Sequence, residues 1–260
     1  ESNPIIEFLY TFFFFLLILY ALYKWNFIRS SGLSIKTLLT LFGVKMLFGF
    51  ILFWVYKYYY LNSNTADIFK YFDDAKVLRH YIFRNSPLDY LKFIFGFDVN
   101  SPDIQEAIKH TKHWVNPNEI NALNDNQAII RIHAFLLLFT FGFFHIHTLI
   151  FCFISFIGSI FLYKTLKSIF PLENSKIIVG VFLIPYVLFW SSGVLKESVL
   201  FFAIGLFIFH WYKIITKPSK VVKSLFLIAI GLYLILILKS YVIVAMIPSL
   251  FAWFIIQKTE

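Results

Sequence analysis

The sequence has few charged residues and a single cysteine. Only 14% of its 260 residues are Asp, Glu, Lys or Arg, whereas 60% are hydrophobic and 22% are aromatic. A soluble domain has about 25% charged residues, so this composition excludes an ordinary soluble domain. Because Cys152 has no second cysteine to pair with, no disulfide can form within the chain. We therefore expect an all-α polytopic membrane protein.

The sequence also lacks the glycine-rich patterns that bind nucleotides. Neither G-x-x-x-x-G-K-[ST] nor G-x-G-x-x-G occurs, and no polar segment is long enough for a nucleotide-binding domain. We therefore predict no nucleotide cofactor, so an activated substrate must arrive from the bilayer or from outside. The net charge of +9 does not predict a nucleic-acid partner, because the basic residues cluster at the ends of apolar runs.

Apolar runs long enough to span a bilayer occur along most of the chain. Since a spanning helix requires about 20 residues, we predict seven to eight transmembrane helices, with candidates at 4–24, 37–59, 128–145, 147–166, 177–192, 197–213, 222–238 and 240–257. The first run, 5–25, is too long for a signal-peptide core and lacks a small-residue cleavage site, which predicts a retained helix. We therefore expect residues 1–59 to form two N-terminal spans. Residues 60–127 are expected to form a long loop with short helices, and residues 128–260 a bundle of five to six helices.

Basic residues predict the orientation of the chain. The loops 24–36, 164–176 and 213–223 are rich in lysine and arginine, which favours the cytoplasmic side. Loop 60–127 is then extracytoplasmic. Two full crossings by 128–145 and 147–166 would place loop 164–176 outside, so either the charge rule fails there or 128–145 is re-entrant or tilted. Abundant Phe, Ile, Lys and Asn fit an AT-rich genome and predict a bacterial cytoplasmic (inner) membrane.

Three aspartates gather in the stretch TADIFKYFDDAKVLRHY, residues 65–81. In a helix, Asp67, Tyr71 and Asp74 fall on one face, whereas Asp73 points elsewhere. One interpretation is structural, with Asp67 in a capped first turn and the other two carboxylates facing solvent. The functional interpretation is a carboxylate pair that acts as general base or holds a divalent cation.

Two further segments carry polar residues beside apolar runs. In FWSSGVLKES, residues 189–198, we expect Ser192, Lys196 and Glu197 either to form an ordinary turn or to bind a phosphate at a helix N-terminus. In NDNQAIIRIHAFLLLF, residues 124–139, Arg131 and His133 open an apolar segment. Arg131 either binds a phosphate bidentately or extends to the interface.

Other polar residues in apolar surroundings carry weaker predictions. His145 and His147 are expected at the membrane interface, and His110 with His113 supplies too few ligands for a metal site. Lys45 lies inside a predicted span, where it faces a partner helix or a phosphate unless the span is shifted.

Residues 60–215 resemble membrane glycosyltransferases. Asp67-x3-Tyr71-x3-Ala75 resembles the D-x3-Y-x3-A pattern in the first outer loop of the GT-C superfamily, and residues 131–167 resemble the segment after that loop. FWSSGVLKES is similar to a motif in bacterial polysaccharide-assembly proteins, including O-antigen-polymerase-like ones. The chain departs from the GT-C pattern in having a helix pair before the loop and no His-Pro-Pro before residue 128.

The resemblance implies transfer of a sugar from a polyprenyl-phosphate-linked donor to an extracytoplasmic glycan or lipid-linked acceptor. Asp67 would be the base, and Asp73 or Asp74 would be a second acidic residue. The reaction would use no nucleotide, and a requirement for a divalent cation stays open. The residues expected around the substrate are Tyr71, Arg131, His133, Ser192, Lys196 and Glu197. Two alternatives stay open: a non-enzymatic scaffold or anchor subunit of a larger complex, and a lipid-linked oligosaccharide polymerase or transporter. Few ionisable residues within the spans argue against a transporter.

Overall fold

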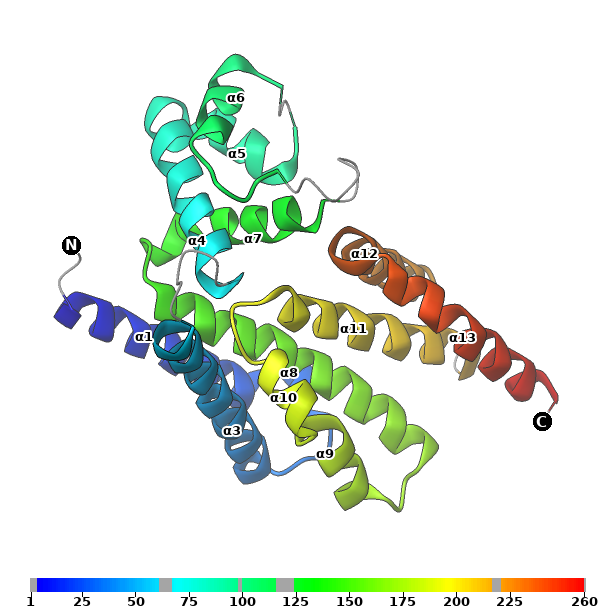
Figure 1. Cartoon of the computed structure of the whole chain (residues 1–260). Helices are drawn as coiled ribbons and strands as arrows, with labels where there is room; N and C mark the ends of the chain where they lie inside the picture. Colours follow the sequence, from blue (N-terminus) through cyan, green and yellow to red (C-terminus); the bar gives the residue numbers. More distant parts are fainter. Residues whose placement is uncertain (1–3, 61–66, 98–99, 116–123, 217–220, 260) are drawn as a thin grey trace.

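The chain folds into helices throughout the residues that the computed structural model describes, which are 4–60, 67–97, 100–115, 124–216 and 221–259 (Figure 1). The elements are α1 (Pro4–Lys24), α2 (Asn26–Arg29), α3 (Ile35–Trp54), the π-helical turn η1 (Val55–Tyr59), α4 (Asp67–Leu78), the π-helical turn η3 (Arg79–Phe83), α5 (Pro87–Phe95), α6 (Pro102–Lys109), α7 (Asp125–Thr140), α8 (Phe144–Ile169), α9 (Asn174–Phe182), α10 (Pro185–Trp190), α11 (Lys196–Thr216), α12 (Val221–Lys239) and α13 (Tyr241–Thr259).

Five helices in the described ranges are long and apolar enough to cross a membrane. They are Pro4–Lys24, Ile35–Tyr59, Phe144–Ile169, Lys196–Thr216 and Val221–Lys239. Large apolar side chains stay exposed along α1, α12 and α13, among them Phe8, Phe226 and Phe251. Such surfaces are unfavourable in water but match a hydrocarbon solvent. The chain is therefore an integral membrane protein, with five candidate spans where the sequence predicts seven to eight.

The predicted span 128–145 becomes the shorter helix α7. Asn124 caps its start by accepting the backbone N–H of Asn126 at 3.0 Å. The helix ends where Phe141 and Gly142 adopt left-handed backbone conformations, with φ of 53° and 87°. Because its 16 residues extend about 24 Å, α7 is too short to cross a hydrocarbon core of about 30 Å alone.

The predicted span 177–192 is interrupted at Pro185. Proline lacks a backbone N–H and disfavours helical geometry in the residue before it. Accordingly, α9 ends at Phe182, Ile184 is extended with ψ of 117°, and α10 begins at Pro185. The predicted span 240–257 becomes α13, whose apolar part, Tyr241–Trp253, is shorter than a full span.

The helices α8 and α11 form the centre of the bundle and run in the same direction. Gly158 lies beside Phe202, and Phe161 packs against Phe209, so both chains advance together along the contact. A Cβ added at Gly205 would overlap the carbonyl oxygen of Gly158. Glycine is needed at this crossing because the two backbones approach one another so closely.

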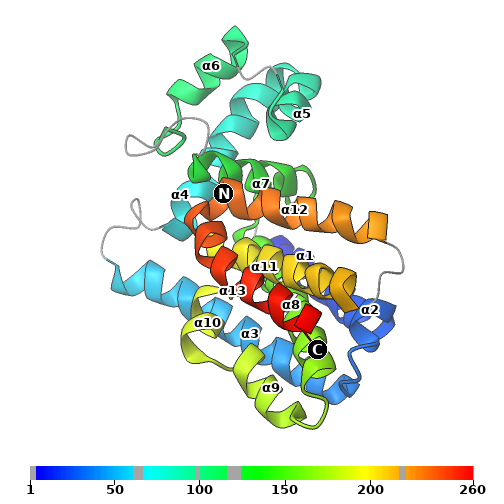
Figure 2. The same cartoon turned by 90° about the vertical axis from the view of Figure 1, so that its right-hand side faces the viewer.

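The helices α4 to α6 form an outer unit at one end of the bundle, beside α7 (Figures 1 and 2). Tyr90 of α5 is fully buried and donates a hydrogen bond of 2.8 Å to the carbonyl of Ala134 in α7. Phe93 and Trp114 belong to the same buried cluster. Aromatic burial and this hydrogen bond therefore fasten the outer unit to α7.

Candidate functional site

The two segments singled out in the sequence, 65–81 and 189–198, meet in space. Ile68 of α4 and Leu195, just before α11, pack in one buried cluster with Leu52 of α3. The helix α4 begins at Asp67, the residue directly before Ile68. The side chain of Asp67 lies outside the described part of the chain. Packing of apolar neighbours therefore brings the two polar motifs together.

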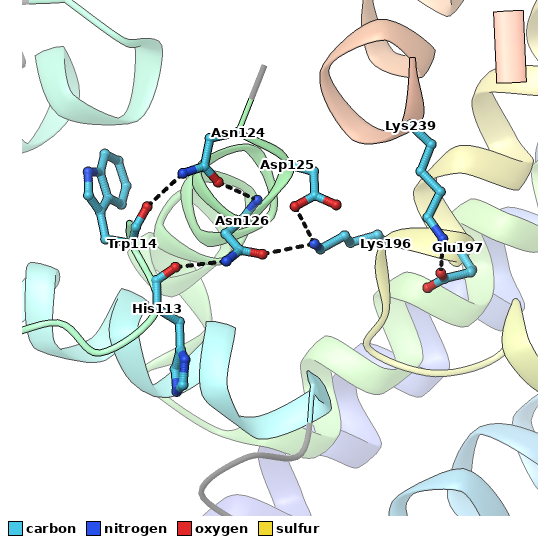
Figure 3. A network of polar contacts seen from close by, with 8 residues as sticks. All are labelled: His113, Trp114, Asn124, Asp125, Asn126, Lys196, Glu197 and Lys239. Carbon is cyan, nitrogen blue, oxygen red and sulfur yellow. Dashed lines mark hydrogen bonds and ion pairs between the residues drawn. The ribbon is translucent and has the colours of Figure 1, made fainter. Parts of the chain in front are cut away.

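Lys196 lies where α4, α7 and α11 converge. Its Nζ is 2.5 Å from Oδ1 of Asp125 and donates a hydrogen bond of 2.9 Å to Oδ1 of Asn126 (Figure 3). The same Nζ lies 4.8 Å from the ring centroid of buried Tyr71. A cation at the first position of α11 is disfavoured by the helix dipole, and the Asp125 carboxylate offsets that cost.

Asn124 and Asn126 join this site to the segment before α7. The side-chain amide of Asn126 donates to the carbonyl of His113 at 2.9 Å, and that of Asn124 donates to the carbonyl of Trp114 at 3.1 Å (Figure 3). Both asparagines are buried. The α7 N-terminus is therefore held by a connected network in which each buried amide has partners.

Asp74 holds the same segment from the other side. Its carboxylate is 3% exposed and accepts the backbone N–H groups of Lys112 at 3.0 Å and His113 at 2.7 Å. Because both oxygens are engaged in these charge-assisted bonds, Asp74 positions the chain and is poorly placed as a general base. Asp73, in contrast, is exposed. Desolvation of its carboxylate raises the pKa of Asp73, and repulsion from Asp74 adds to the rise.

Ser192 and Glu197 have structural partners rather than an open site. The hydroxyl of Ser192 is fully buried and donates to the carbonyl of Leu188. Glu197 accepts a hydrogen bond from Lys239 at 2.7 Å, which ties the start of α11 to the end of α12 (Figure 3). The expected anion site therefore reduces to Lys196, which is already paired with Asp125.

His133 and His147 form a buried pair that the sequence did not predict. Their Nδ1 atoms are 2.8 Å apart, and Nε2 of His147 is 2.7 Å from the hydroxyl of Thr140. All three side chains are fully buried, so both histidines face the protein core. His133, Thr140 and His147 follow one another at intervals of seven residues, which was the available signal in the sequence. This spacing did not predict the contact, because His147 lies on a different helix from the other two.

Lys45 is bound by the Ser-Ser-Gly turn. It is 3% exposed, and its Nζ donates a hydrogen bond of 2.9 Å to the hydroxyl of Ser191. The thiol of Cys152 donates to the neighbouring carbonyl of Ser192 at 2.7 Å. The lysine therefore faces a partner segment within the bundle, one of the roles expected for it.

Arg131 lines the largest cavity described. This cavity, of about 590 Å³, lies between α5, α7 and α12. Its lining residues are Ile94, Phe95, Asn124, Gln127, Ala128, Arg131, Ile132, Phe135, Tyr233, Leu234 and Ile237. The guanidinium lies 5.3 Å from the ring centroid of Trp114 and 5.9 Å from that of Phe93. It thus stacks on aromatic rings at the wall of a mixed polar and apolar cavity.

The guanidinium of Arg131 is desolvated but has no anion beside it. Among the described residues, no carboxylate lies within ion-pairing distance, and Nε is buried without a hydrogen-bond partner. Burial lowers the pKa of Arg131, although an arginine stays protonated at neutral pH. A partly buried cation without a nearby carboxylate favours an anionic ligand.

Arg131 and Lys196 do not form a single phosphate site. Lys196 contacts Asp125 and Asn126, whereas the cavity side of α7 carries Gln127, Ala128 and Arg131. At 100° per residue Arg131 lies about 120° around the helix from Asp125 and about 140° from Asn126, so its side chain leaves α7 on another side. Asn124 belongs to both regions, because it lines the cavity and caps the turn that holds Lys196.

No group of three or more histidine, cysteine, aspartate or glutamate side chains comes together as a metal site in the part of the chain that the structure describes. The expected role of Asp67 in holding a divalent cation falls on a side chain outside that part. Comparison with protein-family models, curated proteins and solved structures returns no match, so the likeness to the GT-C superfamily stays a prediction.

Proposed function

We propose that this chain is a membrane glycosyltransferase that takes a sugar from a polyprenyl-phosphate carrier. The observation that carries the proposal is the partly buried Arg131 guanidinium, which lines an amphiphilic cavity, has a buried Nε without a partner and has no carboxylate beside it among the described residues. A lipid-borne phosphate has the negative charge and the paired oxygen acceptors that a planar guanidinium recognises.

The chemistry of the cavity also supports a lipid ligand. Its polar lining comes from Asn124, Gln127 and Arg131, and its apolar lining includes Ile132, Phe135 and Leu234. The α12 wall belongs to one of the five candidate spans. A ligand with a phosphate and an isoprenoid chain would satisfy both parts at once, since ligand pockets combine apolar walls with a few placed polar groups.

The transfer step requires a base near the acceptor hydroxyl. In the proposed reaction, the acceptor oxygen bonds to the anomeric carbon while its proton passes to a carboxylate and the polyprenyl phosphate leaves. Asp67 begins α4 one helical turn before Tyr71, over whose ring Lys196 lies. Asn124 lines the Arg131 cavity and also caps the start of α7, which holds Lys196. This link between the cavity and the start of α4 favours Asp67 as the base, and exposed Asp73 is a second candidate.

Replacing Arg131 with glutamine is expected to weaken binding of a polyprenyl phosphate at least tenfold. The reason is the loss of a charge-assisted contact to phosphate, worth about 1.5–3 kcal/mol. Binding is measured by native mass spectrometry of the detergent-purified protein titrated with polyprenyl phosphate and with unphosphorylated polyprenol. Arg29→Gln, at an exposed residue of α2, is the matched control and should bind as the unmodified chain does.

The two lipid probes separate the possible outcomes. Unphosphorylated polyprenol should bind weakly and equally to both variants, because it lacks the group that Arg131 recognises. Equal affinity of Arg131→Gln and the unmodified chain for polyprenyl phosphate would remove the proposed donor site. If the chain instead binds no polyprenyl phosphate and co-purifies with a stable partner, the scaffold alternative is favoured.

Replacing Asp67 with asparagine is expected to lower sugar transfer at least 100-fold, the size of a lost general base. Transfer is measured as radiolabelled sugar that moves from a polyprenyl-phosphate donor to endogenous glycan in membranes containing the chain. Binding of polyprenyl phosphate should stay unchanged, because Asp67 is assigned to the acceptor. Full transfer by Asp67→Asn would move the base to another residue, and Asp73→Asn is then tested in the same assay.

A further inference from the structure

A second pocket, of about 360 Å³, has a strongly basic lining. Lys76, Arg79, His80 and Arg84 contribute to it, together with Phe83 and the Phe141–Gly142 turn that joins α7 to α8. The basic residues recur at helical spacing along α4 and η3, which places them on one face. The pocket is separate from the Arg131 cavity, since the two share no lining residue.

The positive charges in this pocket exceed the negative charge that the described structure places near them. Among the described residues, none of Lys76, Arg79 and Arg84 has a carboxylate within ion-pairing distance. Asp73, one turn before Lys76, interacts with it electrostatically, whereas the carboxylate of Asp74 is engaged by the backbone of Lys112 and His113. Like charges gathered on one helical face repel one another, so a bound anion would relieve this repulsion.

The position of the pocket points to a lipid as the source of that anion. Phe141 at its rim is 58% exposed and packs against Tyr10, with ring centroids 5.4 Å apart. Tyr10 also contacts Phe143, and it belongs to the first part of α1, a candidate span. Aromatic residues at the end of a span are typical of the membrane–water interface, where lipid phosphates lie.

We propose that Lys76, Arg79, His80 and Arg84 bind the phosphate of an anionic phospholipid headgroup, with Phe141 against its acyl region. Arg79 is held over the ring of Phe83 at 5.8 Å, so part of its conformational freedom is already lost before binding. This site is independent of the proposed sugar transfer. It would fix the outer unit, α4 to α6, to the membrane surface beside α1.

The triple variant Lys76→Gln/Arg79→Gln/Arg84→Gln tests this proposal. Native mass spectrometry of the full chain in detergent measures binding of phosphatidylglycerol, phosphatidylcholine and inorganic phosphate. The unmodified chain is expected to bind phosphatidylglycerol at least fivefold tighter than phosphatidylcholine, and the triple variant should lose this preference. The control Lys57→Gln/Lys109→Gln/Lys112→Gln removes the same charge from exposed lysines elsewhere and should keep it.

Two results would overturn the assignment. One is an unchanged lipid preference in the triple variant. The other is binding of inorganic phosphate as tight as that of phosphatidylglycerol, which would make the pocket a site for a free anion. If the triple variant does not fold, Arg84→Gln alone should weaken binding of phosphatidylglycerol two- to threefold, and equal binding would overturn the proposal as well.

Discussion

Lys196→Met is expected to lower the free energy of unfolding by about 3 kcal/mol, the lower end of the cost of removing one partner of a buried ion pair, because the two side chains are 12% and 16% exposed. The Asp125 carboxylate, only 16% exposed, loses this countercharge, and Oδ1 of Asn126 loses its donor. Because Asn126 also holds the carbonyl of His113, the loss should spread to the outer unit. A change of this size lowers the melting temperature by roughly 6–12 °C in a chain of this length.

The matched control for this prediction is Lys196→Arg. It keeps the charge beside Asp125, so it should retain most of the stability that Lys196→Met loses. Denaturant titration in mixed micelles measures the unfolding free energy of all three proteins. An unfolding free energy of Lys196→Met equal to that of the unmodified chain would show that this pair contributes nothing to stability.

Gly158→Val is expected to destabilise the bundle by about 3 kcal/mol through overpacking. A Cβ at Gly158 would lie 2.7 Å from the Cα of Phe202, a contact that only a shift of one helix backbone relieves. The α8–α11 crossing is the centre of the fold, so no flexible side chain can move aside to accept the added atoms. The measurement is the same titration, together with the fraction of monodisperse protein after heating.

Gly43→Ala supplies the control for the glycine prediction. Gly43 lies within α3, and a Cβ there would meet nothing within 4 Å. Alanine should therefore leave stability unchanged or raise it by up to about 1 kcal/mol, because glycine is the poorer helix former. If Gly158→Val were as stable as Gly43→Ala, the close α8–α11 crossing would be refuted.

Length and hydropathy were sufficient to find the five candidate spans, because each is a long apolar run. They were insufficient where the chain contains a local breaker. Pro185 divides the apolar run 177–192, and the left-handed pair Phe141–Gly142 ends α7 after 16 residues. Both breakers are visible in the sequence, but hydropathy averaged over a window does not register them.

The sequence predicted which motifs form the candidate site, but it did not predict which residues contact one another there. The sequence singled out Lys196, yet Asp125 and Asn126 are distant along the chain and only folding brings them beside it. Phosphate binding was predicted for both Arg131 and Lys196, but Arg131 lines a cavity that does not include Lys196. Tertiary contacts of this kind have no periodic signature in one sequence.

Lys45 has a consequence for how the chain enters the membrane. Its hydrogen-bond partner, Ser191, is 146 residues later in the sequence. At about 5–20 residues per second, the ribosome needs roughly 7–30 s to make that partner. During this interval α3 carries a lysine whose insertion at the middle of a lipid-facing helix costs about 2.5–3.5 kcal/mol. Lys45 therefore gains this hydrogen-bond partner only after α10 has been made, which couples the two halves of the chain during biogenesis.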